Sequence, residues 1–106
     1  MEYEKMYDLV STKFNLSEEE FKNLKVGLSQ RKSHIEPSIL DSFFSLEDAE
    51  KALEKFNNSY QEIIDTDKVE YIYTEVYIQE NYYDDDYYFI NFGEILKYAD
   101  GLKKRG

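Results

Sequence analysis

The chain has 106 residues, no cysteine and a formal net charge of −10. This length predicts one domain, residues 1–106, that buries its core without disulfides or zinc–thiolate centres. The acidic balance excludes general binding to phosphate backbones or anionic membranes and favours basic partners. Because the start lacks a signal-peptide pattern and no apolar run approaches ~18 residues, we expect a cytoplasmic protein without a membrane span.

Two helices are predicted at the start of the chain. The first covers residues 2–14, where apolar side chains recur every three or four residues, as on one stripe of a helix. The members of this stripe are Tyr3, Met6, Tyr7, Val10 and Phe14. The second helix covers residues 18–30 and begins with a capping box, in which Ser17 caps the free amides and Glu20 reaches back. Gly27 lies inside it and weakens it by roughly 1 kcal/mol relative to alanine.

The middle of the chain predicts a connector followed by a long helix. Residues 29–42 show no regular period, and a third strand over 39–44 is compatible with the pattern. The single histidine, His34, has no recognisable catalytic partners, so we expect it to be exposed. A third helix is predicted over 46–64, because Ser45 is a capping residue and apolar residues continue at helical spacing.

The tyrosine-rich part of the chain predicts two strands, over residues 69–80 and 87–92, joined at Asp84-Asp85-Asp86. β-Branched and aromatic residues dominate both segments, which suits a pleated, half-buried surface. Side chains alternate along the first strand, so one face is aliphatic and the other carries tyrosines around Glu75. A short helix over 94–100 is predicted to follow.

Together these elements predict an α+β domain. The N-terminal helices pack on a C-terminal antiparallel β-hairpin or small sheet, and a short C-terminal helix follows. Such a fold relies mainly on contacts between neighbouring elements. We expect the tyrosines to be divided between the core and an exposed contact face.

The acidic charge is concentrated in one segment. Residues 62–94 contain ten acids and one base, and eight of the eleven tyrosines lie between Tyr71 and Tyr98. Two interpretations stay open. Either the acids only keep the protein soluble, or they imitate phosphates in a partner's basic groove while tyrosines supply apolar contact. The predicted partner-binding residues are Asp65, Asp67, Glu70, Tyr71, Tyr73, Glu75, Tyr77, Glu80, Tyr82, Tyr83, Asp84, Asp85, Asp86 and Tyr87.

The same segment contains two signals for other chemistry. Asp84, Asp85 and Asp86 with Glu80 are ligand types for a hard cation, but the EF-hand glycine and distal glutamate are missing, so we expect a solvated turn. Glu75 stands among tyrosines, and we expect a structural carboxylate hydrogen-bonded to their hydroxyls. The sequence therefore predicts no enzymatic activity, no catalytic residue, no metal and no cofactor.

A small, cysteine-free, acidic and tyrosine-rich chain resembles the inhibitor proteins of phages and mobile elements, including anti-CRISPR and anti-restriction proteins that mimic nucleic acid. The run from Phe44 to Leu53, followed by the tyrosine-rich hairpin as far as residue 98, also resembles short phage and plasmid proteins of low-GC Gram-positive bacteria. The first resemblance implies a non-enzymatic inhibitor in the host cytosol, bound to the basic groove of a nucleic-acid-binding protein such as a CRISPR or restriction nuclease. The alternative is a regulatory or accessory protein that forms a homodimer or docks through its tyrosine face without mimicry.

Overall fold

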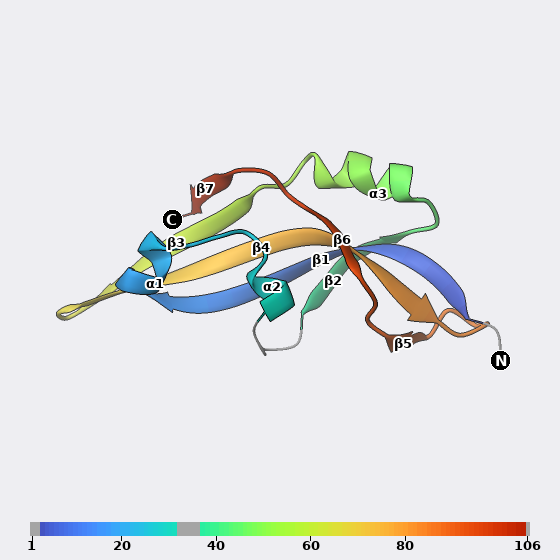
Figure 1. Ribbon diagram of the computed structural model, residues 1–106, viewed down its shortest axis with the longest axis horizontal. Coiled ribbons are helices and arrows are strands. Elements are labelled where there is room, and N and C mark those ends of the chain that lie inside the picture. The colour runs from blue at the N-terminus through green and yellow to red at the C-terminus, as the bar shows by residue number, and fades with distance from the viewer. Residues whose placement is uncertain (1–2, 32–36, 106) are drawn as a thin grey trace.

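A pair of long antiparallel strands forms the centre of the protein. The computed structural model describes residues 3–31 and 37–105 (Figure 1). β1 (Glu4–Ser17) pairs along its whole length with β4 (Lys68–Tyr83). These strands lie far apart in the sequence, so the fold rests on non-local contacts.

Five shorter strands complete a seven-stranded mixed sheet. They are β2 (Ser38–Phe43), β3 (Asn58–Asp65), β5 (Phe89–Asn91), β6 (Ile95–Tyr98) and β7 (Leu102–Arg105). β2 pairs with the outer edge of β1, and β3 forms a hairpin with the first half of β4. β5 and β6 pair with the second half of β4, and β7 runs parallel to β3. β2 and β7 are therefore the outer strands among the described residues.

Short helices cover both faces of this sheet. α1 (Glu18–Lys22) and α2 (Leu28–Arg31) lie on one face, and α3 (Leu46–Leu53) lies on the other. Side chains alternate along β4 between the two faces of the sheet, so Tyr73 packs with the α1–α2 segment, whereas Val76 packs with α3. The sheet is thus the middle layer of a thin, elongated molecule (Figure 1).

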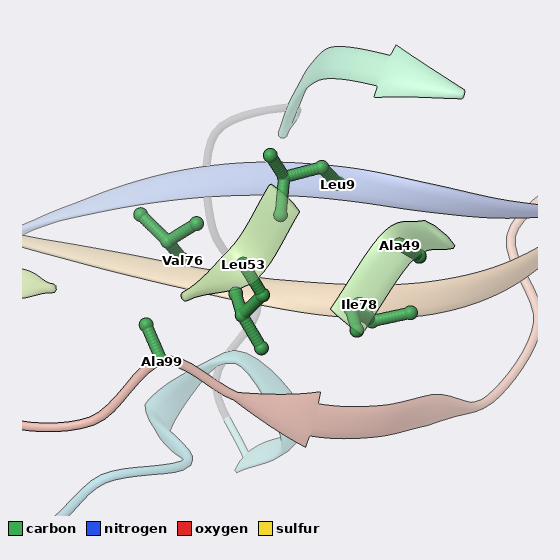
Figure 2. Packing of buried hydrophobic residues seen from close by; sticks show 6 residues of the cluster. All are labelled: Leu9, Ala49, Leu53, Val76, Ile78 and Ala99. Atoms are coloured by element: carbon green, nitrogen blue, oxygen red, sulfur yellow. The ribbon is translucent and has the colours of Figure 1, made fainter. Parts of the chain in front are cut away.

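The core under α3 is small and aliphatic. Its fully buried members are Leu9, Ala49, Leu53, Val76, Ile78 and Ala99, which Figure 2 shows gathered between α3, β1, β4 and the segment after β6. Burying a leucine or isoleucine of this kind contributes roughly 1.5–3 kcal/mol. The helix begins where Ser45 Oγ accepts the backbone N–H of Asp48 at 3.2 Å, so the predicted cap is confirmed.

The predicted α+β class is wrong, because the chain is mostly β-sheet. The helix expected over 2–14 is strand β1. Its buried face includes Asp8 and Thr12, which are 0% and 2% exposed and which interrupt the apolar alternation in the sequence. Both are hydrogen-bonded to side chains of β4, Thr12 to the Tyr77 hydroxyl at 2.8 Å and Asp8 to the Asn81 amide at 2.8 Å. Pairing with β4 therefore overrides the helical stripe.

The helix predicted over 94–100 is wrong, and the helix predicted over 46–64 is correct only as far as Leu53. Residues 95–98 form β6, paired with β4. The third helix ends at Leu53, and β3 begins at Asn58. The side-chain amide of Asn58 donates to the carbonyl of Ala99 at 3.0 Å and accepts from the N–H of Val76 at 2.9 Å, which anchors a strand rather than a helical turn.

The second helix is interrupted rather than absent. The capping box is confirmed: Ser17 Oγ accepts the N–H of Glu20 at 3.2 Å, and the Glu20 carboxylate accepts the N–H of Ser17 at 3.1 Å. The expected helix over 18–30 is divided into α1 and α2. α1 ends at Lys22, where the side-chain amide of Asn23 donates to the carbonyl of Glu19 at 3.1 Å, and α2 begins after Gly27, whose φ of 106° lies in the left-handed region.

The remaining strand boundaries agree in part with those predicted from the sequence. The strand expected over 69–80 lies within β4, which continues to Tyr83, and the return strand over 87–92 is reduced to β5. The compatible strand over 39–44 is present as β2. His34 lies outside the described residues.

Candidate protein-binding site

The turn after β4 has a defined geometry. The N–H of Tyr87 donates to the carbonyl of Asp84 at 3.0 Å, and the N–H of Asp84 donates to the carbonyl of Tyr88 at 2.9 Å. One Asp84 carboxylate oxygen also accepts the N–H groups of Asp86 and Tyr88, at 2.9 and 3.0 Å. This is a three-residue hairpin loop over 85–87 whose last residue, Tyr87, has φ of 63°. Glycine or asparagine is preferred there, so tyrosine occupies this position at an energetic cost.

Large apolar side chains are exposed at the same end of the molecule as this turn. Phe44 and Tyr88 are 73% and 72% exposed. Phe44, which follows β2, meets Tyr87 edge-on with ring centroids 5.8 Å apart. Adjoining apolar side chains exposed in this way mark an interaction surface. We call this surface the aromatic end, and its residues are Tyr3, Phe44, Tyr87, Tyr88, Phe89 and Ile90.

The aromatic end contains an open apolar pocket of about 300 Å³. Its walls come from the start of the chain, from β4 and from β5, and the lining residues are Tyr3, Tyr82, Ile90 and Asn91. Beside it, the ring of Phe89 packs against Tyr83 and Phe92, with centroid distances of 5.8 and 4.7 Å. The base of the surface is therefore held by ring packing, and the pocket is suited to one apolar side chain of a partner.

Three aspartates adjoin these rings. Asp85 and Asp86 are exposed, and Asp84 is half-buried by its hydrogen bonds within the turn. Carboxylates beside aromatic rings suit lysine and arginine, which form charge-assisted hydrogen bonds and also contact ring faces. The chemistry of this end therefore favours a basic partner surface.

The tyrosine face predicted on β4 is mostly core. Tyr73 and Tyr77 are 0% and 1% exposed, and Tyr83 is 7% exposed. Tyr71 is half-buried, and the ring of Phe21 stacks on it with centroids 4.0 Å apart and planes 8° apart. The α1–α2 segment thus covers tyrosines that the sequence analysis assigned to partner contact. Of that predicted set, Tyr87 belongs to the aromatic end, and Tyr82 lines its pocket.

Burial changes the acidity of these phenols. Loss of water, and then the hydrogen bond to the Asp8 carboxylate, raises the pKa of Tyr83 to about 12. Burial also raises the pKa of Tyr77, and it raises that of Tyr73, where the negative charge of Glu75 adds to the effect. These hydroxyls therefore remain protonated at neutral pH.

Glu75 ties the α1–α2 segment to the sheet. It is 0% exposed, and its carboxylate accepts the N–H groups of Gly27, Leu28 and Ser29 at 2.8, 3.3 and 2.9 Å. It also accepts the hydroxyls of Ser29 at 2.6 Å and Tyr73 at 3.0 Å. The predicted hydrogen bond to a tyrosine hydroxyl is confirmed, and this carboxylate faces the interior rather than a partner.

The other predicted acids are divided between the two ends of a molecule 54 Å long (Figure 1). The group at the β3–β4 hairpin consists of Asp65, Asp67 and Glu70, and the group at the opposite end of β4 consists of Asp84, Asp85 and Asp86. Between them, Glu80 is half-buried and forms an ion pair with Lys5 at 2.5 Å. The acids therefore form two separate groups rather than one continuous face.

Most of the aromatic end was not predicted from the sequence, namely Tyr3, Phe44, Tyr88, Phe89 and Ile90. A signal for it was present in the sequence. Residues 87–90 are four consecutive large apolar side chains, which cannot all face the core from an alternating strand. The adjacent residues Phe43 and Phe44 likewise cannot both face the core from one strand.

No known protein family matches this chain, and comparisons with curated proteins and with solved structures found no match. Within residues 3–31 and 37–105, no three side chains of metal-binding type converge. In the same ranges, no helix is long and apolar enough to cross a membrane. The candidate site therefore rests on its geometry and chemistry.

Proposed function

We propose that this chain is a non-enzymatic protein-binding module that docks through its aromatic end on a basic surface of another protein. The observation that carries this proposal is the left-handed Tyr87 at the tip of the β4–β5 turn. This conformation costs a non-glycine residue about 1 kcal/mol or more, and such strain clusters at functional positions. Here it fixes a half-exposed tyrosine ring against Phe44, next to the aspartates of the turn.

Recognition at this surface combines apolar and charged contacts. The exposed rings supply a large contact area, and the pocket beside Tyr82 accepts one aliphatic or aromatic side chain of the partner. Asp85 and Asp86 attract lysine and arginine around that anchor and accelerate association. The partner's contact surface therefore has one apolar side chain surrounded by lysines and arginines.

The partner in this proposal is a nucleic-acid-binding protein, such as a nuclease, that the chain inhibits. Two features support this choice. The net charge of −10 matches a basic groove. The length of 54 Å corresponds to roughly 16 base pairs at about 3.4 Å each, and both ends of the rod carry carboxylates. A rod of this length and charge fills the groove in which the partner protein binds nucleic acid, without placing a carboxylate at the position of every phosphate.

The test is capture of partners from a host lysate by the immobilised chain at low salt, with and without competing DNA. Tyr88→Ser removes an exposed ring of the aromatic end, and Ile64→Ser is its matched control, because the two side chains are 72% and 71% exposed. We expect a nucleic-acid-binding protein that is retained by the parent and by Ile64→Ser, and lost with Tyr88→Ser or with DNA. A partner whose retention is unchanged both by competing DNA and by Tyr88→Ser would contradict the proposal.

The alternative function is a homodimeric accessory protein in which two aromatic ends bury each other. The exposed apolar side chains of that end are the observation that favours it. Sedimentation equilibrium separates the two functions. A dimer would be populated at micromolar concentration, would respond little to salt and would dissociate in Tyr88→Ser. A monomer at all concentrations would eliminate this alternative.

A further inference from the structure

A second cavity lies on the opposite edge of the sheet from β2, and its charge is opposite to that of the whole molecule. It has a volume of about 260 Å³ and lies between the segment that joins α3 to β3 and the outer strand β7. Figure 1 shows these two stretches of chain close together at the β3–β7 edge of the sheet. The lining residues are Lys55, Phe56, Asn57, Ser59, Lys103 and Lys104.

The lysines of this cavity are poorly neutralised. Among the described residues, neither Lys55 nor Lys103 has an ion-pair partner, whereas Lys5, for example, is held by Glu80 at 2.5 Å. Lys104 has only a long contact with Glu62, at 4.0 Å. Lys103 and Lys104 are consecutive in β7 and pair with Ser59 and Tyr60, so their side chains lie on opposite faces of the sheet, and only Lys103 shares the face of Ser59. The cations available to a ligand beside Ser59 are therefore Lys55 and Lys103, and an anion between them is attracted to both.

The cavity also contains polar and aromatic groups suited to a ligand. Ser59 is only 5% exposed, and its hydroxyl has no hydrogen-bond partner. The side-chain amide of Asn57 donates to the carbonyl of Asp100 at 2.7 Å, which fixes its orientation at the wall. The ring of Phe56 is 38% exposed, which is enough to stack on a flat ligand group.

We propose that this cavity binds a nucleoside monophosphate, with its phosphate between Lys55 and Lys103 and its base against Phe56. A phosphate dianion matches two lysines better than a carboxylate does, since it carries more charge and more acceptor oxygens. The volume lies just below the roughly 300–1,000 Å³ of typical ligand sites, which limits the ligand to one phosphate and one base. The site is independent of the aromatic end.

Calorimetric titration of the whole chain with AMP, adenosine and inorganic phosphate tests this assignment. We expect AMP to bind more tightly than either fragment. Lys55→Gln/Lys103→Gln is expected to weaken AMP binding roughly tenfold or more, because charge-assisted contacts are lost. The control Lys13→Gln/Lys68→Gln removes two lysines outside the cavity and should leave AMP binding within about twofold of the parent.

Two further variants separate the parts of the site. Phe56→Leu should weaken AMP and leave inorganic phosphate unchanged, because only the base contacts the ring. Lys104→Gln should leave both affinities within about twofold of the parent, because its side chain lies on the opposite face of the sheet from Lys103. Circular dichroism of each variant checks that the fold is retained, as expected for exposed side chains.

Three results would overturn the proposal. These are equal affinity for adenosine and AMP, equal losses in the cavity and control lysine variants, and the absence of saturable AMP binding at millimolar concentration. Tighter binding of a 5′-phosphorylated oligonucleotide than of AMP would also overturn it, since the ligand would then be the end of a nucleic acid.

Discussion

At the scale of single residues, the unusual feature is a buried carboxylate used as a structural clamp. Glu75 lies in the middle of β4, where a charge is costly unless hydrogen bonds replace its water. Three backbone N–H groups and two hydroxyls do so, and all but one of these five donors belong to residues 27–29. The clamp holds the start of α2 on the sheet, whereas α1 is held by the stacking of Phe21 on Tyr71.

Glu75→Gln tests this clamp. The amide is the same size, but it accepts at one atom only and points an N–H₂ at backbone donors, so several donors lose their partner. We expect a loss of about 2–4 kcal/mol in the free energy of unfolding, measured by urea denaturation. Glu70→Gln is the control, because Glu70 is exposed, and it should change stability by less than about 0.5 kcal/mol. A loss no larger in Glu75→Gln than in Glu70→Gln would mean that the clamp contributes nothing.

The buried tyrosines predict how stability depends on alkaline pH. The pKa of Tyr83 rises from its ordinary value of 10.0 to about 12 in the folded chain. Since the folded state holds the proton more tightly than the unfolded state, this contribution is complete below pH 10 and is lost as the pH rises toward 12. Urea midpoints should therefore fall between pH 10 and 12, and more steeply in the parent than in Tyr83→Phe. The exposed Tyr88→Phe should keep the parental slope, and equal slopes in all three would contradict the assignment.

At the scale of elements, local signals were predictable and non-local pairings were not. The caps at Ser17 and Ser45 were identified because every group in a capping motif lies within four residues. The strand character of β4 was identified from its β-branched and aromatic composition. Strand β1 was not identified, because Asp8 and Thr12 are acceptable on a buried face only when Asn81, Tyr83 and Tyr77 of β4 are already opposite.

The candidate site shows the same division between local signals, which were predictable, and non-local contacts, which were not. The turn at Asp84-Asp85-Asp86 was predicted from its aspartates, and Tyr87 next to it is half-exposed. The burial of Tyr73 and Tyr77 was not predicted, because the alternation along β4 does not indicate which of its two faces the α1–α2 segment covers. The contact between Phe44 and Tyr87 joins residues from distant parts of the chain, so no local pattern indicates it.

Tyr87→Gly separates function from stability at the β4–β5 turn. Glycine removes the left-handed strain, so we expect the free energy of unfolding to stay the same or rise by up to about 1 kcal/mol. Partner affinity should fall roughly tenfold or more, because an exposed tyrosine anchor is lost. Urea denaturation and surface plasmon resonance with the captured partner measure the two effects. A variant that binds normally would mean that the strained ring does not contact the partner.

At the scale of the whole molecule, the long β1–β4 pair makes a rod rather than a globule, and this shape separates charge. One end carries the aspartates of the β3–β4 hairpin, and the other carries Asp85 and Asp86 beside exposed rings. Because the ends are 54 Å apart, well beyond the Debye length of about 8 Å at physiological salt, each end meets a partner as an independent electrostatic site. Variants of equal charge at the two ends therefore distinguish local recognition from the effect of net charge.

Asp85→Lys/Asp86→Lys and Asp65→Lys/Asp67→Lys make that comparison. Both change the net charge by four units at exposed positions, and Asp84, whose carboxylate holds the turn, is retained, so neither should unfold the protein. At low salt we expect the first variant to bind the captured partner roughly tenfold or more weakly than the second, and its affinity to depend less on salt. If the Asp65→Lys/Asp67→Lys variant were the weaker binder, the docking surface would lie at the β3–β4 hairpin, and the exposed rings of the aromatic end would be left without a role in this complex.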